Sequence, residues 1–224
     1  MKVTTDSCLF GAWAAEQVHN LEIEVNNILD IGTGTGLLSL MLAQNCNAII
    51  DAIEIDKQTA TQANENVQVS PFSEKIKIHF ADVHQFGFEK KYDIIISNPP
   101  FYEKELKSEH KKKNIAHHNE GLLLKDLLPI IHKQLQPDGS FYLLLPFKRN
   151  EEIRNLLVQH EFAIWKMTFV RQTAKHDYFR IMVAGGIKAD NIVETIIDEI
   201  TIRDEEENYT SAFTNLLRDY YLYL

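Results

Sequence analysis

Residues 27–36 read NILDIGTGTG, and this stretch decides the fold. A largely apolar run leads into alternating glycines, and residues 37–44 that follow have the apolar spacing of a helix. Glycine lets the backbone turn tightly and lets a ligand approach it closely. The stretch therefore predicts a strand at 27–31, a glycine loop and a helix, with a ligand site where the strand ends.

The same alternation of strand and helix continues outward from this stretch. Strands are expected at 48–54, 75–80, 92–97 and 140–145, and helices at 57–68, 122–135 and 151–160. Residues 162–170 and 178–184 predict a closing antiparallel pair, and residues 137–139 a turn. We therefore expect a doubly wound α/β fold, Rossmann-like, with a mainly parallel seven-stranded sheet and an antiparallel edge hairpin.

The composition and length fit one globular domain over residues 1–224. With 45% hydrophobic and 25% charged residues, the chain is unlike disordered, collagen-like or coiled-coil proteins. Residues 1–26 form an N-terminal lead-in to the first strand. Residues 186–224 form an acidic tail, in which we expect a strand at 199–202 and a helix at 211–223.

Several classes of protein are excluded by what the chain lacks. Two cysteines, Cys8 and Cys46, are too few for a disulfide scaffold or a zinc ribbon. No run of 18 apolar residues occurs and no signal-peptide pattern begins the chain, so we expect a cytoplasmic protein without a membrane span. His117 and His118 have no further ligands at metal-site spacing, so no metal is expected.

The net charge of −9 argues by itself against a polyanionic partner, but its distribution changes that interpretation. Residues 189–224 hold nine acids and two bases, whereas residues 101–118 hold five lysines and three glutamates. A net acidic chain can thus present a basic face to nucleic acid, although such runs are often only solvated loops. The candidate contacts are Lys104, Lys111, Lys112, Lys113, Arg171 and Arg180.

Acidic residues stand at or just after the ends of three successive expected strands, beginning with Asp30 just before the glycines. The loop reads Gly-x-Gly-x-Gly, and Leu37 stands where a dinucleotide-binding fingerprint needs its last glycine, so a pyrophosphate ligand is disfavoured. Glu54, followed by Ile55, can accept both hydrogen bonds of a ribose diol. Asp82 can accept from an adenine amino group, and the N–H of Val83 can reach a ring nitrogen.

The fourth strand runs into a second motif, SNPPFY at residues 97–102. Two prolines have fixed φ and no N–H, so they stop the strand and leave the Asn98 side chain and the Pro99 carbonyl exposed. Two fixed acceptors can hold both N–H groups of an adenine amine or a glutamine amide, which are poor nucleophiles, and no general base is needed. Phe101 or Tyr102 can stack on a planar base. Without the glycine loop, a plain Asx–Pro turn is the better interpretation.

The glycine loop with its acids resembles class I S-adenosylmethionine-dependent methyltransferases, and the second motif resembles the signature of amino methyltransferases. The wider chain resembles the bacterial valine-tRNA adenine-N6 methyltransferases, which act on adenosine 37 beside the anticodon. The segments that carry this resemblance are 1–6, 9–14, 37–44, 62–66, 70–72, 95–102, 202–203, 208–213 and 221–224. It implies S-adenosyl-L-methionine as cofactor, tRNA as substrate, and an enzyme that we expect to be monomeric.

The resemblance also assigns roles to individual residues. It implies that the catalytic group is Asn98, Pro99, Pro100 and Phe101. The cofactor-binding residues that it implies are Asp30, Gly32, Gly34, Gly36, Glu54, Ile55, Asp82, Val83 and Asn98. Tyr102 joins the basic residues named above as a tRNA contact. Thr5, Asp6 and Trp13 would lie on the cofactor side, although a core position is the better prediction for Trp13.

Three alternatives remain open at this point. Release-factor glutamine methyltransferases share the chemistry, but they usually carry a helical N-terminal domain for which residues before Asp30 leave no room. Ribosomal-RNA guanine-N2 methyltransferases share the motif and are often longer. A non-catalytic module that only binds S-adenosylmethionine is opposed by the two intact motifs standing together.

Overall fold

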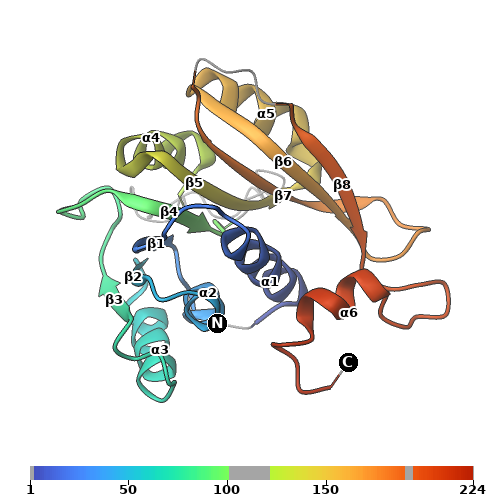
Figure 1. The fold of residues 1–224 in the computed structure, drawn as a ribbon, viewed down its shortest axis with the longest axis horizontal. Helices are drawn as coiled ribbons and strands as arrows, with labels where there is room; N and C mark the ends of the chain where they lie inside the picture. The colour runs from blue at the N-terminus through green and yellow to red at the C-terminus, as the bar shows by residue number, and fades with distance from the viewer. Residues whose placement is uncertain (1–2, 101–121, 190–193, 224) are drawn as a thin grey trace, which may run out of the picture.

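The computed structural model describes residues 3–100, 122–189 and 194–223, which build one mixed sheet (Figure 1). The strand order is β3-β2-β1-β4-β5-β7-β6-β8. The strands are β1 Asn27–Ile31, β2 Ile49–Glu54, β3 Ile76–Phe80, β4 Tyr92–Ser97, β5 Leu135–Pro146, β6 Phe162–Arg171, β7 Tyr178–Ile187 and β8 Ile196–Thr201. Strands β1 to β5 pair in parallel, and β7 is antiparallel to both β5 and β6. The expected doubly wound, mainly parallel sheet is confirmed.

The expected number of seven strands is wrong, because the acidic tail adds an eighth. Strand β8 pairs in parallel with β6, so the hairpin of β6 and β7 is not the edge of the sheet. The acids of β8 meet bases of β6: Lys166 Nζ lies 3.2 Å from Asp198 Oδ2, and Arg171 pairs with Glu199. These ion pairs and the backbone ladder explain why a segment of like charges joins a sheet.

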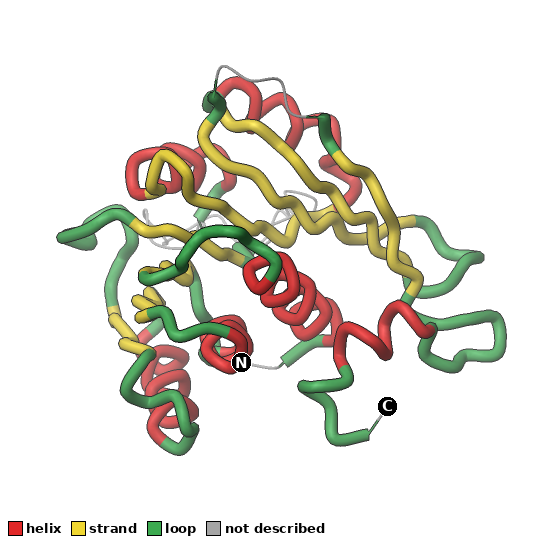
Figure 2. Tube along the Cα trace, in the orientation of Figure 1, coloured by secondary structure: helices red, strands yellow, loops and turns green. Residues whose placement is uncertain are grey.

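Helices cover both faces of the sheet (Figure 2). They are α1 Thr5–His19, α2 Leu37–Asn45, α3 Lys57–Gln68, α4 Leu124–Gln134, α5 Asn150–Gln159 and α6 Ser211–Leu217, with a 3₁₀ turn η1 at Phe147–Arg149. One apolar core lies under α1, α2, α3 and α6, and the other under α4 and α5. Two sequence expectations are corrected. Helix α6 ends six residues before the expected 223. Residues 137–139 form no turn but lie within β5, where extra residues of β5 shift its register against β4.

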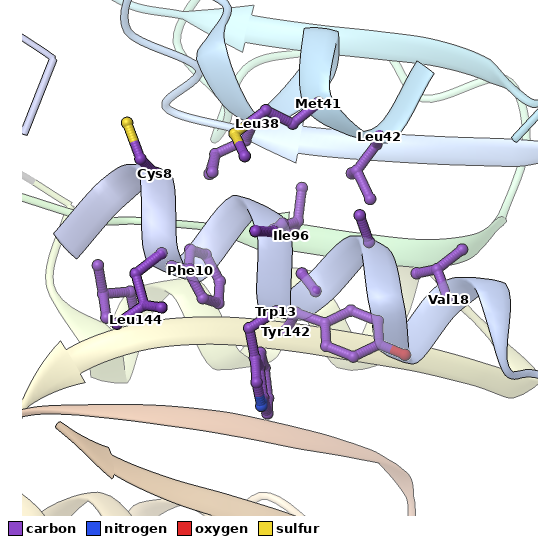
Figure 3. Close-up of a cluster of buried hydrophobic side chains, with 14 of the residues drawn as sticks. Cys8, Phe10, Trp13, Val18, Leu38, Met41, Leu42, Ile96, Tyr142 and Leu144 are labelled. Carbon is purple, nitrogen blue, oxygen red and sulfur yellow. The ribbon is translucent and has the colours of Figure 1, made fainter. Parts of the chain in front are cut away.

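Most of the N-terminal lead-in forms a buried helix, α1 (Figure 3). Helix α1 lies between α2, which contributes Met41 and Leu42, and β5, which contributes Tyr142. Trp13 is 2% exposed and meets the Tyr142 ring edge-on, with 5.9 Å between the ring centroids. The prediction that Trp13 is a core aromatic is therefore confirmed. Burial of this helix places its first turn at the edge of the sheet where the site lies.

The close approach of β5, β6 and β7 leaves no room for a side chain at Gly185. A Cβ there would lie 2.4 Å from the Ala163 backbone oxygen and 2.6 Å from Cζ of Phe141. We expect Gly185→Ala to lower the free energy of unfolding by about 3 kcal/mol, because a backbone atom of β6 must move. Urea unfolding measures the change. The matched control is Gly87→Ala, since a Cβ at Gly87 has nothing within 4 Å; equal stability of the two variants would contradict the packing described.

Candidate active site

The glycine loop between β1 and α2 bends sharply because three of its residues have positive φ. Gly32, Gly34 and Gly36 have φ values of 73°, 60° and 81°. The N–H groups of Gly32 and Thr33 donate to the Ile53 carbonyl at 2.9 and 3.0 Å. These bonds tie the loop to the end of β2. The predicted loop at the carboxyl end of β1 is present, and each of its glycines has a backbone conformation that L-residues rarely adopt.

Asp30 lies at the base of this loop and is completely buried. Its Oδ2 accepts from the hydroxyls of Thr33 at 2.6 Å and Ser39 at 2.7 Å. Its Oδ1 has no hydrogen-bond partner among the described residues. Burial raises the pKa of the carboxyl to about 6, although the two hydroxyls oppose that shift. A buried acceptor without a partner fits a ligand that brings a donor.

Glu54 ends β2 and braces the same loop. Its Oε2 accepts from the Gly34 N–H at 3.0 Å, and its Oε1 accepts from the Asp56 N–H at 2.9 Å. Each carboxylate oxygen keeps a second lone pair for a ligand hydroxyl. Ile55, the next residue, is 61% exposed. The bracing role was missed by sequence reasoning, because the bond to Gly34 spans twenty residues.

Asp82 and Val83 lie beside the end of β2, because the Ala81 N–H donates to the Glu54 carbonyl at 3.0 Å. Asp82 is half-buried and its Oδ1 accepts from the His84 N–H at 2.9 Å, which closes a local Asx turn. Val83 is buried. The acids at the ends of β1 and β2 and just after β3 therefore lie at one edge of the sheet, as the sequence predicted.

The second motif begins at the same edge, where β4 ends beside β1. Ser97 pairs with Ile31, and the Ser97 hydroxyl donates to the Ile31 carbonyl at 2.7 Å. Asn98 is half-buried, Pro99 is buried and Pro100 is exposed. The Asn98 Nδ2 donates to the Ser7 hydroxyl of α1 at 2.9 Å. Sequence reasoning missed Ser7 because it lies 91 residues from Asn98 and belongs to no motif.

A small, mainly apolar hollow opens beside the motif. Pro99 and Pro100 line it on one side, and Leu145, Pro146 and Arg149 on another. Arg149 pairs with Glu152, and its Nε donates at 2.8 Å. The hollow therefore offers apolar surface beside Pro99 and one guanidinium, which is paired with a carboxylate.

Of the remaining predicted site residues, two arginines are paired with carboxylates and the rest are not described by the structure. Arg180 donates from Nε to Asp6 Oδ2 at 2.8 Å, and Arg171 donates to Thr201 at 2.9 Å and pairs with Glu199. The others lie outside the described residues: Phe101, Tyr102, Lys104, Lys111, Lys112 and Lys113. In the part of the chain that the structure describes, no group of three or more potential ligands could hold a metal ion, and no helix is long and apolar enough to cross a membrane.

Comparison with known proteins defines the class. Residues 16–145 match the Methyltransferase small domain family. A predicted O-methyltransferase from Agrobacterium tumefaciens has a similar crystal structure, with a TM-score of 0.71 and 16% identity over 94% of this chain and 95% of that one. The crystal structure of a ribosomal protein L11 methylase from Lactobacillus delbrueckii subsp. bulgaricus is also similar, with a TM-score of 0.57. Its sequence is 17% identical over 80% of this chain and 78% of that one. The fold is that of the class I methyltransferases, and the chain is an enzyme of the methyltransferase class.

Relatives in sequence narrow this class. A tRNA1(Val) (adenine(37)-N6)-methyltransferase of Parabacteroides distasonis is 35% identical over 224 residues, which is 99% of this chain and 91% of the relative. A protein of the same name from Dyadobacter fermentans is 46% identical over 169 residues, which is 75% of this chain and 67% of the relative. The chain belongs to the tRNA1(Val) (adenine(37)-N6)-methyltransferase family.

The raised pKa of Asp30 makes the stability of the protein depend on pH. The folded pKa of about 6 exceeds the ordinary value of 3.8, so the protonated Asp30 carboxyl contributes to stability. That contribution is fully present below pH 3.8 and is lost as the pH rises through 6. We expect the free energy of unfolding of the wild type to fall by about 3 kcal/mol relative to Asp30→Asn, which does not titrate, between roughly pH 4 and pH 7.5. Urea unfolding of both proteins without cofactor measures the difference. A difference independent of pH would show that the carboxyl titrates normally.

Proposed function

We propose that this protein transfers a methyl group from S-adenosyl-L-methionine to the N6 amine of adenosine 37 in a tRNA, with valine tRNA as the species named for its relatives. The observation that carries the proposal is the meeting of two loops at one sheet edge. The glycine loop with the open Oδ1 of Asp30 lies beside Asn98, which is held by a bond from its own amide. One loop suits the cofactor and the other suits the amine.

The cofactor would lie over the glycine loop. S-adenosylmethionine supplies a methyl group that is electrophilic because it is bonded to a sulfonium sulfur. The Oδ1 of Asp30 would accept from the cationic amino group of the cofactor, directly or through water. Glu54 would accept from the ribose hydroxyls, with Ile55 beside it, and Asp82 and Val83 would bind the adenine ring. The glycines Gly32, Gly34 and Gly36 let the backbone approach it closely.

The acceptor amine would be held by Asn98 and Pro99. The lone pair of an exocyclic amine is delocalised into the ring, so the amine attacks poorly unless its geometry is changed. The Asn98 Oδ1 and the Pro99 carbonyl would each accept one N–H, which turns the lone pair toward the methyl group. Pro100 stiffens the loop, and Phe101 or Tyr102 would stack on the base. The new N–C bond would form as the C–S bond of the cofactor breaks, so that S-adenosyl-L-homocysteine leaves. The amine would then release one proton to water without a general base.

Basic residues in several parts of the chain would contact the tRNA. Lys104 and Lys111 to Lys113 would contact phosphates, as would Arg171 and Arg180 if the RNA competes for them with their carboxylate partners. Pro100 and Arg149, which line the small hollow, would contact a neighbouring nucleotide. We further propose that residues 1–224 act as a single domain and a monomer, in the cytoplasm where such a substrate is found.

Methyl transfer from labelled S-adenosylmethionine tests the function. The acceptors are tRNA that lacks the modification, ribosomal RNA and a release factor, each digested so that the labelled product is identified. We expect label in N6-methyladenosine from tRNA, and mapping by fragment should place it at position 37. Label in N2-methylguanosine or in N5-methylglutamine would keep the chemistry and overturn the substrate. S-adenosylmethionine binding without transfer to any acceptor would instead support the non-catalytic module.

Two substitutions should distinguish the role of the Asn-Pro-Pro motif in catalysis from the role of the glycine loop in cofactor binding. Asn98→Ala is expected to lower kcat by roughly 10² to 10³, because one preorganised acceptor is lost, while the Kd of the cofactor changes little. Asp30→Ala is expected to raise the Kd of the cofactor instead. Calorimetry and single-turnover kinetics measure the two quantities. The matched control is Asn64→Ala, an exposed asparagine of α3, which should behave as the wild type. Near-normal turnover by Asn98→Ala would refute the two-acceptor mechanism.

A further inference from the structure

Ser7 and Asn98 form a contact that joins the first turn of α1 to the end of β4. The Nδ2 of Asn98 donates to the Ser7 Oγ at 2.9 Å, and both residues are half-buried. Figure 1 shows α1 lying against the sheet on the side of α2. We infer that Ser7 is a positioning residue that orients the Asn98 carboxamide, so that its oxygen and not its NH₂ group faces the reacting amine. This inference rests on the proposed function.

A carboxamide needs such a partner because its two ends have nearly the same shape and opposite hydrogen-bonding character. The amine to be methylated offers N–H groups, so it requires an acceptor. If the Asn98 amide turned over, its NH₂ group would face the NH₂ group of the substrate, and the contact would become repulsive. An acceptor on the other side of the amide holds the Nδ2 end and leaves the Oδ1 end for the substrate.

A hydroxyl is both donor and acceptor, so its own proton must be directed elsewhere to make the orientation definite. Thr4 Oγ1 lies 2.8 Å from the Ser7 Oγ, a position from which it can accept that proton. When the Ser7 proton points to Thr4, the Ser7 oxygen can only accept, and the favoured group at Asn98 is then Nδ2. The N-cap residue of α1, Thr4, makes no side-chain capping bond, so its hydroxyl is available to Ser7.

The first turn of α1, which carries Ser7, is held to strand β7 by an ion pair. The Ser7 N–H donates to Asp6 Oδ1 at 3.1 Å, and Asp6 Oδ2 accepts from Arg180 Nε of β7 at 2.8 Å. The Cys8 N–H also donates to the Thr4 carbonyl at 3.1 Å. Asp6 and Arg180 are both mainly shielded, with side chains 15% and 26% exposed, so water screens this pair less than an exposed one. Ser7 is therefore held in place for Asn98.

An isosteric pair of variants tests the hydroxyl. Ser7→Thr and Ser7→Val have the same shape and similar helix propensity, and they differ in whether the hydroxyl is present. We expect Ser7→Val to lower kcat about tenfold relative to Ser7→Thr, as the loss of one hydrogen bond suggests, with an unchanged Kd for S-adenosylmethionine. Both variants should unfold at similar urea concentrations. Equal kcat values for the pair would overturn the inference.

A double-mutant cycle tests whether Ser7 acts through the orientation of Asn98. In the Asn98→Asp background a carboxylate presents an oxygen to the amine whichever way it turns, so Ser7→Ala should there change kcat less than twofold. In the wild-type background Ser7→Ala should lower kcat about tenfold. Equal losses in both backgrounds would show a structural role only and overturn the inference.

The same measurements separate this inference from the proposed function. Normal turnover by Asn98→Ala would refute the two-acceptor mechanism, and with it any role for Ser7 in orienting the amide. An inactive Asn98→Ala protein together with a wild-type kcat for Ser7→Ala would refute the role of Ser7 alone.

Discussion

The parallel pairing of β1 with β4 is the constraint on which the rest of the structure depends. The chain leaves β1 into the glycine loop and leaves β4 into the Asn-Pro-Pro motif, and the register places Ile31 beside Ser97. The Ser97 hydroxyl donates to the Ile31 carbonyl at 2.7 Å, at the last residue of each strand. Two loops that are more than sixty residues apart in the chain therefore begin side by side. Strand β2 pairs with β1 on the side away from β4, and β3 pairs with β2. Glu54 at the end of β2 and Asp82 just after β3 therefore lie at the same edge of the sheet as the two loops.

This edge combines groups that oppose stability with groups that hold them in place. Asp30 is a buried carboxyl with an oxygen that lacks a partner in the described residues, and its burial is unfavourable once it ionises. The loop over it needs three positive φ values, and the hydrogen bonds to Ile53 and Glu54 hold that conformation. Strain and an open acceptor at a ligand site are physically consistent, since a bound ligand would satisfy the acceptor and strengthen the loop.

Much of the fold was predictable because it follows from local patterns. Helix α3 and strands β1 and β4 have the predicted bounds, and the other parallel strands differ by a few residues, because apolar runs between polar turns locate them. The acids of the site were predictable for the same reason, since Asp30 and Glu54 stand at the ends of strands and Asp82 closely follows one. Three features were not. Strand β8 joins the sheet through ion pairs with β6, residues 137–139 lie in a strand although their composition favours a turn, and Ser7 contacts Asn98 across the fold.

By itself the sequence determined the alternation of strands and helices, the glycine loop, and the motif that follows β4. Each of these is encoded within a few consecutive residues by hydrophobic period, by glycine or by proline. The tertiary structure alone decided which side chains meet. It gave the Asn98 amide a hydroxyl partner from α1, gave Asp6 a guanidinium from β7, and turned the bases predicted for RNA, Arg171 and Arg180, toward carboxylates. Such contacts depend on strand register and helix packing over many residues, and no local pattern contains that information.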